Sequence, residues 1–151
     1  MDSESYMHQA LALAREAMDA GEVPVGCVVA DGAGRIVGTG RNRREETADA
    51  TAHAETEAIR AACAALGTWH LTDCTMFVTL EPCPMCTGAI IMARIPTLVF
   101  GAREAQTGSC GSVIDLFAER YGHSPAVYPG VLADESAALL RAFFRGKRQL
   151  P

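Results

Sequence analysis

The chain has 151 residues, of which 49% are hydrophobic and 21% charged, and its net charge is −5. This composition is typical of a globular protein and excludes a disordered chain, so we expect a single domain over residues 1–151. No run of about 18 apolar residues occurs, so no membrane span is expected. The start, MDSESYMHQ, lacks the features of a signal peptide. We therefore expect a cytoplasmic protein in which disulfides do not persist.

Basic side chains nonetheless gather at two places in this acidic chain, which are Arg41, Arg43 and Arg44, and Arg141, Arg145, Lys147 and Arg148. Nucleic-acid-binding proteins usually show such a basic face, whereas the net charge argues mildly against an RNA partner. A short run of charge can equally be a solvated surface. Charge alone therefore leaves RNA contact open.

Hydrophobic periodicity predicts the secondary structure in chain order. Residues 5–20 have apolar side chains at helical spacing and form the first expected helix. VGCVVA (25–30) and RIVGTG (35–40) flank a Gly-rich turn, which indicates a β-hairpin. The polar segment 41–51 is expected to be a loop. An Ala-rich helix over 52–66 follows it and ends at a glycine.

A second group of elements surrounds a proline-rich turn. TMFVTL (75–80) is an expected buried strand, and a helix over 84–94 begins with proline, which is tolerated in a first helical turn. With the strand TLVFG (97–101), this spacing predicts a parallel βαβ unit. The remaining expectations are a loop at 102–112, a strand at 126–128 and a last helix at 134–147. Together these elements indicate the α/β class, with a mixed sheet covered by helices on both faces.

The stretch LEPCPMC places the thiols of Cys83 and Cys86 between that strand and that helix. A redox pair would need only a helix N-terminus that lowers a thiol pKa. A structural zinc would need four protein ligands, and Cys63 or Cys74 could supply extra thiols. A catalytic metal site would need a third ligand and an open position. The thiols outside LEPCPMC have apolar or small neighbours and are expected to be buried and free: Cys27, Cys63, Cys74 and Cys110.

The stretch TAHAE (51–55) favours the catalytic interpretation. His53-x-Glu55 followed by Pro-Cys83-x-x-Cys86 is the known signature of zinc deaminases. Three protein ligands leave a zinc position for water, which the metal makes hydroxide-like near neutral pH. Glu55 would carry protons from that water to the substrate. Residues at i and i+2 do not share a helix face, so His53 and Glu55 must converge through the geometry of the first turn.

These stretches, together with GEVPVGCVV (21–29), VTLEPCPMCTGAI (78–90) and GVLADESAALLRAFFR (130–145), give the chain its resemblance to a known family. It resembles the cytidine deaminase superfamily and, within it, the bacterial tRNA-specific adenosine deaminases over nearly its whole length. The resemblance implies a three-layer α/β/α fold with about five strands and one Zn²⁺ per subunit. It also implies conversion of adenosine to inosine at the wobble (first anticodon) position, by a homodimer that binds the tRNA anticodon stem-loop.

The resemblance also assigns roles to individual residues. The zinc ligands would be His53, Cys83 and Cys86, and the proton shuttle would be Glu55. The expected substrate contacts are Asn42 at the purine edge, Pro24 and Val25 in the pocket wall, and Ala54 and Glu104. Glu104 stands where the family usually has aspartate, and Gln106 where it usually has lysine, so the metal chemistry is expected to be kept while RNA contacts differ.

Two other functions remain open. A deaminase of a free base or nucleoside, such as guanine or cytosine, needs no basic surface and often closes its pocket with a C-terminal segment. A zinc-stabilised binding module without turnover has no use for a carboxylate at Glu55. The helix TGAIIMARI (87–95) is apolar nearly all round, which suits either a buried helix or a dimer interface.

Overall fold

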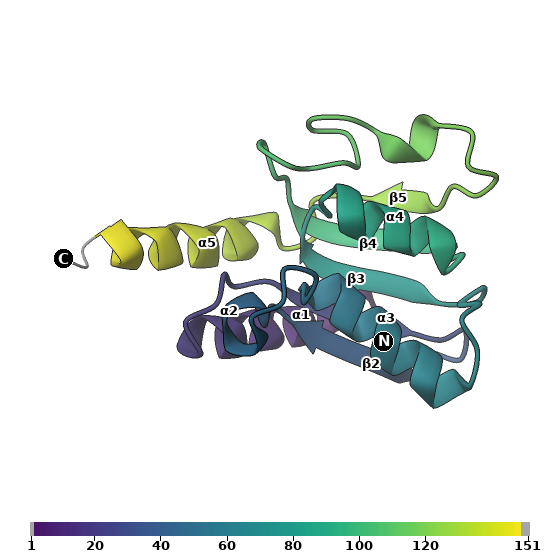
Figure 1. Cartoon of the computed structure of the whole chain (residues 1–151), viewed down its shortest axis with the longest axis horizontal. Helices are drawn as coiled ribbons and strands as arrows, with labels where there is room; N and C mark the ends of the chain where they lie inside the picture. Colours follow the sequence, from purple (N-terminus) through teal and green to yellow (C-terminus); the bar gives the residue numbers. More distant parts are fainter. Residues whose placement is uncertain (1, 149–151) are drawn as a thin grey trace.

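A mixed sheet runs through the molecule, and the computed structural model describes it within residues 2–148 (Figure 1). The strand order is β2-β1-β3-β4-β5, with bounds β1 Gly26–Ala30, β2 Ile36–Arg41, β3 Thr75–Leu80, β4 Thr97–Ala102 and β5 Ala126–Tyr128. Strand β1 pairs antiparallel with β2 and β3, whereas β3, β4 and β5 run parallel. The predicted hairpin and the predicted parallel pair are both confirmed.

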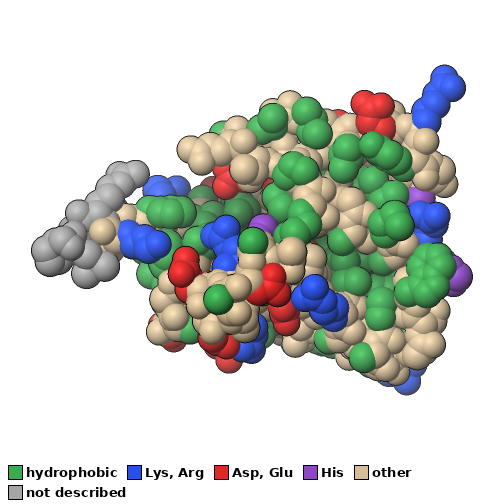
Figure 2. Space-filling model, in the orientation of Figure 1, with side chains coloured by type: hydrophobic (Ala, Val, Ile, Leu, Met, Phe, Trp, Pro, Cys, Tyr) green, Lys and Arg blue, Asp and Glu red, His purple; other side chains and the backbone are tan. Residues whose placement is uncertain are grey.

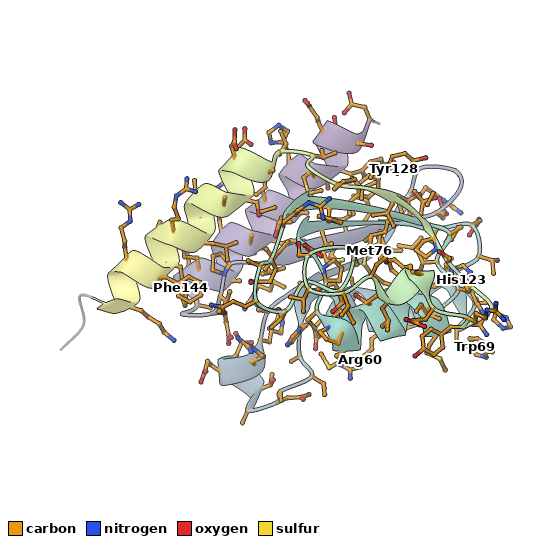
Figure 3. The ribbon with its side chains drawn as sticks, turned by 90° about the horizontal axis from the view of Figure 1, so that it is seen from above. Arg60, Trp69, Met76, His123, Tyr128 and Phe144 are labelled. Atoms are coloured by element: carbon orange, nitrogen blue, oxygen red, sulfur yellow. The ribbon has the colours of Figure 1, made fainter. Side chains whose placement is uncertain are left out.

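Helices cover both faces of this sheet, which confirms the expected α/β class. Their bounds are α1 Ser3–Asp19, α2 Arg44–Thr47, α3 Ala54–Leu66, α4 Pro84–Met92, the 3-10 turn η1 Leu116–Ala118 and α5 Ala133–Arg148. Helices α3 and α4 lie in front of the sheet in Figure 1, and α1 lies behind it. Figure 3 shows α5 beside α1 on that second face. No described helix is both long enough and apolar enough to span a membrane.

The alternation of side chains along the strands divides the core between the two faces. On one face, Val28 and Phe77 pack with Met7 of α1. On the other, Phe100 packs with Ile90 of α4. Successive strand residues point to opposite faces, so each of the strands β1 to β4 supplies both cores. Burial of each such large apolar side chain contributes about 1.5–3 kcal/mol, which holds the helices and their N-termini in place.

Strand β2 and helix α3 approach each other closely, because β2 carries glycines on the side that meets the helix. A Cβ atom at Gly40 would lie 2.7 Å from the backbone nitrogen of Ala58 and would also meet the carbonyl oxygen of Ala54. Only a residue without a side chain allows this contact. The first turn of α3 is thereby held beside the end of β2.

The segment 41–51, expected to be a loop, contains the short helix α2, so this expectation is wrong for four residues. Its first amide groups bond to a side chain more than twenty positions away. The buried carboxylate of Glu22 accepts hydrogen bonds from the backbone N–H groups of Glu45 (3.1 Å) and Glu46 (2.7 Å). A helix N-terminus needs such acceptors, and here they are absent from the local sequence.

All six cysteines are free. Cys27, Cys74 and Cys110 are buried, as expected. Cys63 is only half-buried, contrary to expectation, because it lies on α3 beside an open groove that Trp69 and Met92 also line.

Candidate active site

Two helix N-termini meet beside the end of β3 and bring three metal-binding side chains together. His53 is the N-cap of α3, Cys83 is the N-cap of α4, and Cys86 lies in the first turn of α4. The Nδ1 atom of His53 lies 3.6 Å from Cys83 Sγ and 3.5 Å from Cys86 Sγ. The three ligand atoms all lie within 4.8 Å of one another.

This geometry fits a tetrahedral zinc ion. Zn–N and Zn–S bonds of about 2.05 and 2.3 Å place the nitrogen and sulfur atoms about 3.5 Å apart at a tetrahedral angle, close to the observed separations. Within residues 2–148 the cluster consists of His53, Cys83 and Cys86, and neither Cys63 nor Cys74 belongs to it. Three protein ligands are typical of a catalytic zinc site, whereas a structural site has four and a redox pair needs no histidine.

The two thiols differ in acidity. Hydrogen bonds with Cys86 and with His53 lower the pKa of Cys83 to about 4, despite partial burial. The pKa of Cys86 is raised, because its thiol donates to Cys83 and is buried. A metal ion binds the thiolate form, so Cys83 presents a ready ligand and Cys86 releases its proton when the metal arrives.

Glu55 converges on the same point as His53. His53 precedes the helix with extended backbone angles (φ −84°, ψ 159°), so its side chain departs before the helical turn begins. Glu55 lies inside the first turn, and 4% of its surface is exposed. Burial raises its pKa to about 7, which suits a carboxyl group that takes up and releases protons near neutral pH.

A cavity of about 270 Å³ opens over this cluster. Among the expected substrate contacts, Val25, Asn42 and Glu104 line it together with His53 and Glu55. The volume lies just below the range of small-ligand pockets, about 300–1,000 Å³, and suits a single base better than a longer ligand. Pro24 and Ala54 are buried and lie outside the cavity lining.

Asn42 ties β2 to the first turn of α3 and still faces the cavity. Its Nδ2 donates to the carbonyl of Val23 (3.1 Å), and its Oδ1 accepts from the backbone N–H of Ala54 (3.2 Å). An amide has two N–H groups and two lone pairs on its oxygen. One donor and one acceptor position therefore remain for a ligand.

A larger groove of about 820 Å³ lies elsewhere, between α1, β2 and α3. Its basic side chains are engaged with acidic ones, since Arg41 and Arg43 pair with Glu46, and Arg60 pairs with Glu57. The candidate metal ligands lie outside this groove, so we assign the chemistry to the smaller cavity.

Comparison with known families agrees with this geometry. Residues 1–102 match the model of the cytidine and deoxycytidylate deaminase zinc-binding region. The chain belongs to the cytidine and deoxycytidylate deaminase family. The domain is therefore a zinc-binding domain of this family, with His53, Cys83 and Cys86 positioned to bind the metal ion.

Similar proteins divide into two kinds by length. The deaminase is 44% identical to a tRNA-specific adenosine deaminase of Bacillus subtilis over 97% of this chain and 91% of that protein. It is 51% identical to a tRNA(Ile)-lysidine synthase of Deinococcus deserti, again over 97% of this chain but only 27% of that protein. The chain thus spans about a quarter of that longer relative.

A solved structure also matches this deaminase closely. It comes from biochemical and structural studies of A-to-I editing by tRNA deaminases at the wobble position of transfer RNA. The TM-score is 0.86 at 42% identity, over 90% of this chain and 99% of that chain. The expected cytidine-deaminase-like fold is confirmed.

The cavity of the deaminase also includes residues that sequence reasoning missed. Phe144 reaches it from α5, Leu80 from the end of β3, and Thr107 from the loop after β4. Arg44 lines it too, although only its charge had drawn attention. No local signal places Phe144 at this site, because 89 positions separate it from Glu55 and only the packing of α5 brings it there.

Proposed function

We propose that this deaminase converts adenosine to inosine at the wobble position of a tRNA. The observation that carries the proposal is a base-sized cavity over a three-ligand metal site, with Phe144 and the exposed Arg44 at its lining. The similar tRNA-specific adenosine deaminase supports the same substrate. RNA enzymes that act on a base take it out of the stack into such a pocket.

The residues around the cavity divide the work of the reaction. A zinc ion held by His53, Cys83 and Cys86 would supply a strongly acidified water for attack on the purine ring. Glu55 accepts one proton of that water and passes it to the ring nitrogen; it then accepts the remaining hydroxyl proton and delivers it to the departing amine. Water is consumed, the C–N bond breaks, and ammonia leaves. Asn42 holds the purine edge, and Val25 packs against the flat face of the base.

The position of α5 favours an RNA substrate over a free base. Figure 1 shows α5 extending beyond the edge of the sheet, and Phe144 on this helix lines the cavity. Among the side chains of this helix that the structure describes, three basic ones are exposed, namely Arg141, Arg145 and Lys147. Arg44 makes no ion pair among the described residues and is free to meet a phosphate. These features fit the anticodon stem-loop of a tRNA as partner.

The test is inosine formation at the first anticodon position of a tRNA that carries an ACG anticodon. Ammonia release from free adenine, guanine, cytosine and cytidine is measured in parallel. The expected result is inosine in the tRNA and no ammonia release from the free bases or cytidine. Ammonia release from a free base, with no inosine in the tRNA, would be consistent with the assigned metal centre but would contradict the proposed tRNA substrate.

Replacing Arg145 by alanine should weaken tRNA binding and make the binding less sensitive to salt. Loss of one phosphate contact should make the negative slope of the logarithm of the binding constant against log[salt] shallower by about 0.7–0.9. Turnover at saturating tRNA should change little. Binding titrations at several salt concentrations measure the slope. Arg35→Ala is the control, because Arg35 pairs with Asp31 in the turn of the hairpin, at the opposite end of β2 from Asn42. An unchanged slope for Arg145→Ala would remove α5 from the RNA interface.

We also propose that the protein forms a homodimer through the face of α4. Figure 2 shows hydrophobic side chains spread over the side of the molecule that carries α3 and α4. Large exposed side chains on this face include Trp69, Met92 and Tyr121. Met92, 68% exposed, lies between two apolar clefts of about 380 and 260 Å³. Monomeric proteins rarely leave such patches in water, and a second copy offers a complementary apolar surface.

Changing Met92 to glutamate should convert the dimer to a monomer, because a charge would be buried without a partner. Sedimentation velocity measures the molecular mass in solution. Tyr128→Glu is the matched control, since Tyr128 is 56% exposed on β5 and lies apart from Trp69 in Figure 3. A monomeric wild-type protein, or a Met92→Glu variant that stays dimeric, would contradict this interface.

We place the reaction in the cytoplasm. The six free thiols fit a reducing compartment. The proposed tRNA substrate is found there as well.

A further inference from the structure

One wall of the cavity is a segment without regular secondary structure. Residues 103–112 leave β4 and lead towards η1, and Glu104, Gln106 and Thr107 of this segment line the cavity. Its own backbone bonds are an isolated bridge between Cys110 and Asp115 and turn bonds such as that from the N–H of Gly108 to the carbonyl of Glu104 (2.9 Å), and these local bonds do not tie it to the sheet. Something else must hold its backbone for the cavity to keep its shape.

That support comes from the buried carboxylate of Glu81, which is 2% exposed. Its Oε1 accepts from the backbone N–H of Glu104 (3.1 Å) and from the hydroxyl of Ser112. Its Oε2 accepts from the backbone N–H groups of Cys110 (3.0 Å) and Ser112 (3.1 Å). An ionised carboxylate has about four acceptor positions, and here all are used on one segment.

The segment is shaped to let this carboxylate in. A Cβ atom at Gly108 would lie 2.5 Å from Glu81 Cδ and 2.6 Å from Oε1, so only glycine leaves room. The backbone N–H of Ser109 also donates to the carbonyl of Pro82 (2.9 Å), next to the metal ligand Cys83. The wall is therefore tied to the turn that leads into α4.

We propose that Glu81 is a positioning residue that holds the wall 103–112 in place for substrate binding. Three of its four bonds go to backbone N–H groups, so the hold does not depend on which side chains the segment carries. Glu104 and Gln106 can thus stand where the family usually has aspartate and lysine without a change in the backbone of the wall. The expected effect on tRNA binding rests on the proposed function, whereas the expected effect on the backbone of residues 103–112 does not.

The first test is Glu81→Gln. In either orientation the glutamine amide turns an N–H₂ group towards a backbone N–H, so two acceptor positions are lost with little change in volume. Hydrogen exchange at Glu104, Cys110 and Ser112 should become at least about tenfold faster, with the core strands unchanged. The KM for tRNA should rise about tenfold while kcat changes less than about twofold. Bound zinc should stay at one per chain.

A second variant disturbs the same contact by a change in the segment rather than in Glu81. Gly108→Ala should reproduce the exchange pattern and the KM rise, because its methyl group would meet both the carboxylate of Glu81 and the carbonyl oxygen of Glu104 and would push the two apart. Ser112→Ala removes a single hydroxyl bond and should give a smaller effect. Glu119→Gln, an exposed carboxylate outside the segment, should leave exchange in the segment and KM unchanged.

The outcomes separate this proposal from the proposed function. Unchanged exchange in the segment, or faster exchange throughout with loss of zinc, would overturn the role of Glu81. A fall in kcat with constant KM would also overturn it, because the defect would then lie in the chemistry. If the wild-type protein modified no tRNA, the exchange and zinc measurements would still decide whether Glu81 holds the wall, and the KM comparison would use the base that is deaminated.

Discussion

Replacing Glu55 by glutamine should nearly abolish deamination while zinc remains bound. Glutamine has almost the same shape but cannot take up the proton that the reaction releases. Because proton transfer by a positioned side chain contributes about 10²–10⁴-fold, we expect a loss of kcat in that range. Glu55 belongs to the cavity lining but not to the metal cluster, so the ligands His53, Cys83 and Cys86 stay in place.

The measurement is single-turnover inosine formation at saturating tRNA, with zinc determined by atomic absorption on the same sample. Glu57→Gln is the matched control, because Glu57 lies two residues further along α3 and forms a partly exposed pair with Arg60 at 3.4 Å. This control should keep nearly full activity, since exposed ion pairs contribute little. A fully active Glu55→Gln variant would show that another group carries the proton.

Replacing Cys86 by alanine should remove both the metal and the activity. Two ligands cannot hold the ion as three do, so bound zinc should fall from about one per chain to nearly none. The melting temperature should fall as well, because zinc that binds only the folded state stabilises it. Chelation of zinc from the wild-type protein should produce the same loss of activity, reversed when zinc is restored.

Cys74→Ala separates the metal effect from the loss of a buried thiol. Both cysteines have 0% exposed surface, but Cys74 lies outside the metal cluster and its thiol contacts Asp73. Cys74→Ala should cost stability through lost packing and keep its zinc. If Cys86→Ala retained full zinc and activity, His53 and Cys83 would have to find another ligand, and the proposed centre would be wrong.

The local sequence determined most of the fold and the identity of the metal ligands. Apolar periodicity located the strands and long helices, because burial on one face imposes a period of 2 or 3.6. The metal ligands could be named because His53-x-Glu55 and Pro-Cys83-x-x-Cys86 match the zinc-deaminase signature, and each part of it stands at the start of a helix. Helix N-termini favour negative charge, which suits a site with two thiolates.

Only the tertiary structure decided how the cavity is walled. Helix α2 forms because Glu22 caps it from a distant position, Phe144 reaches the cavity through the packing of α5, and Glu81 holds a segment up to 31 residues away. The convergence of His53 with Glu55 likewise depends on the extended backbone of the N-cap. Periodicity reports which face of an element is buried. It carries no information about which distant carboxylate meets which backbone N–H, and those contacts set the shape that a substrate encounters.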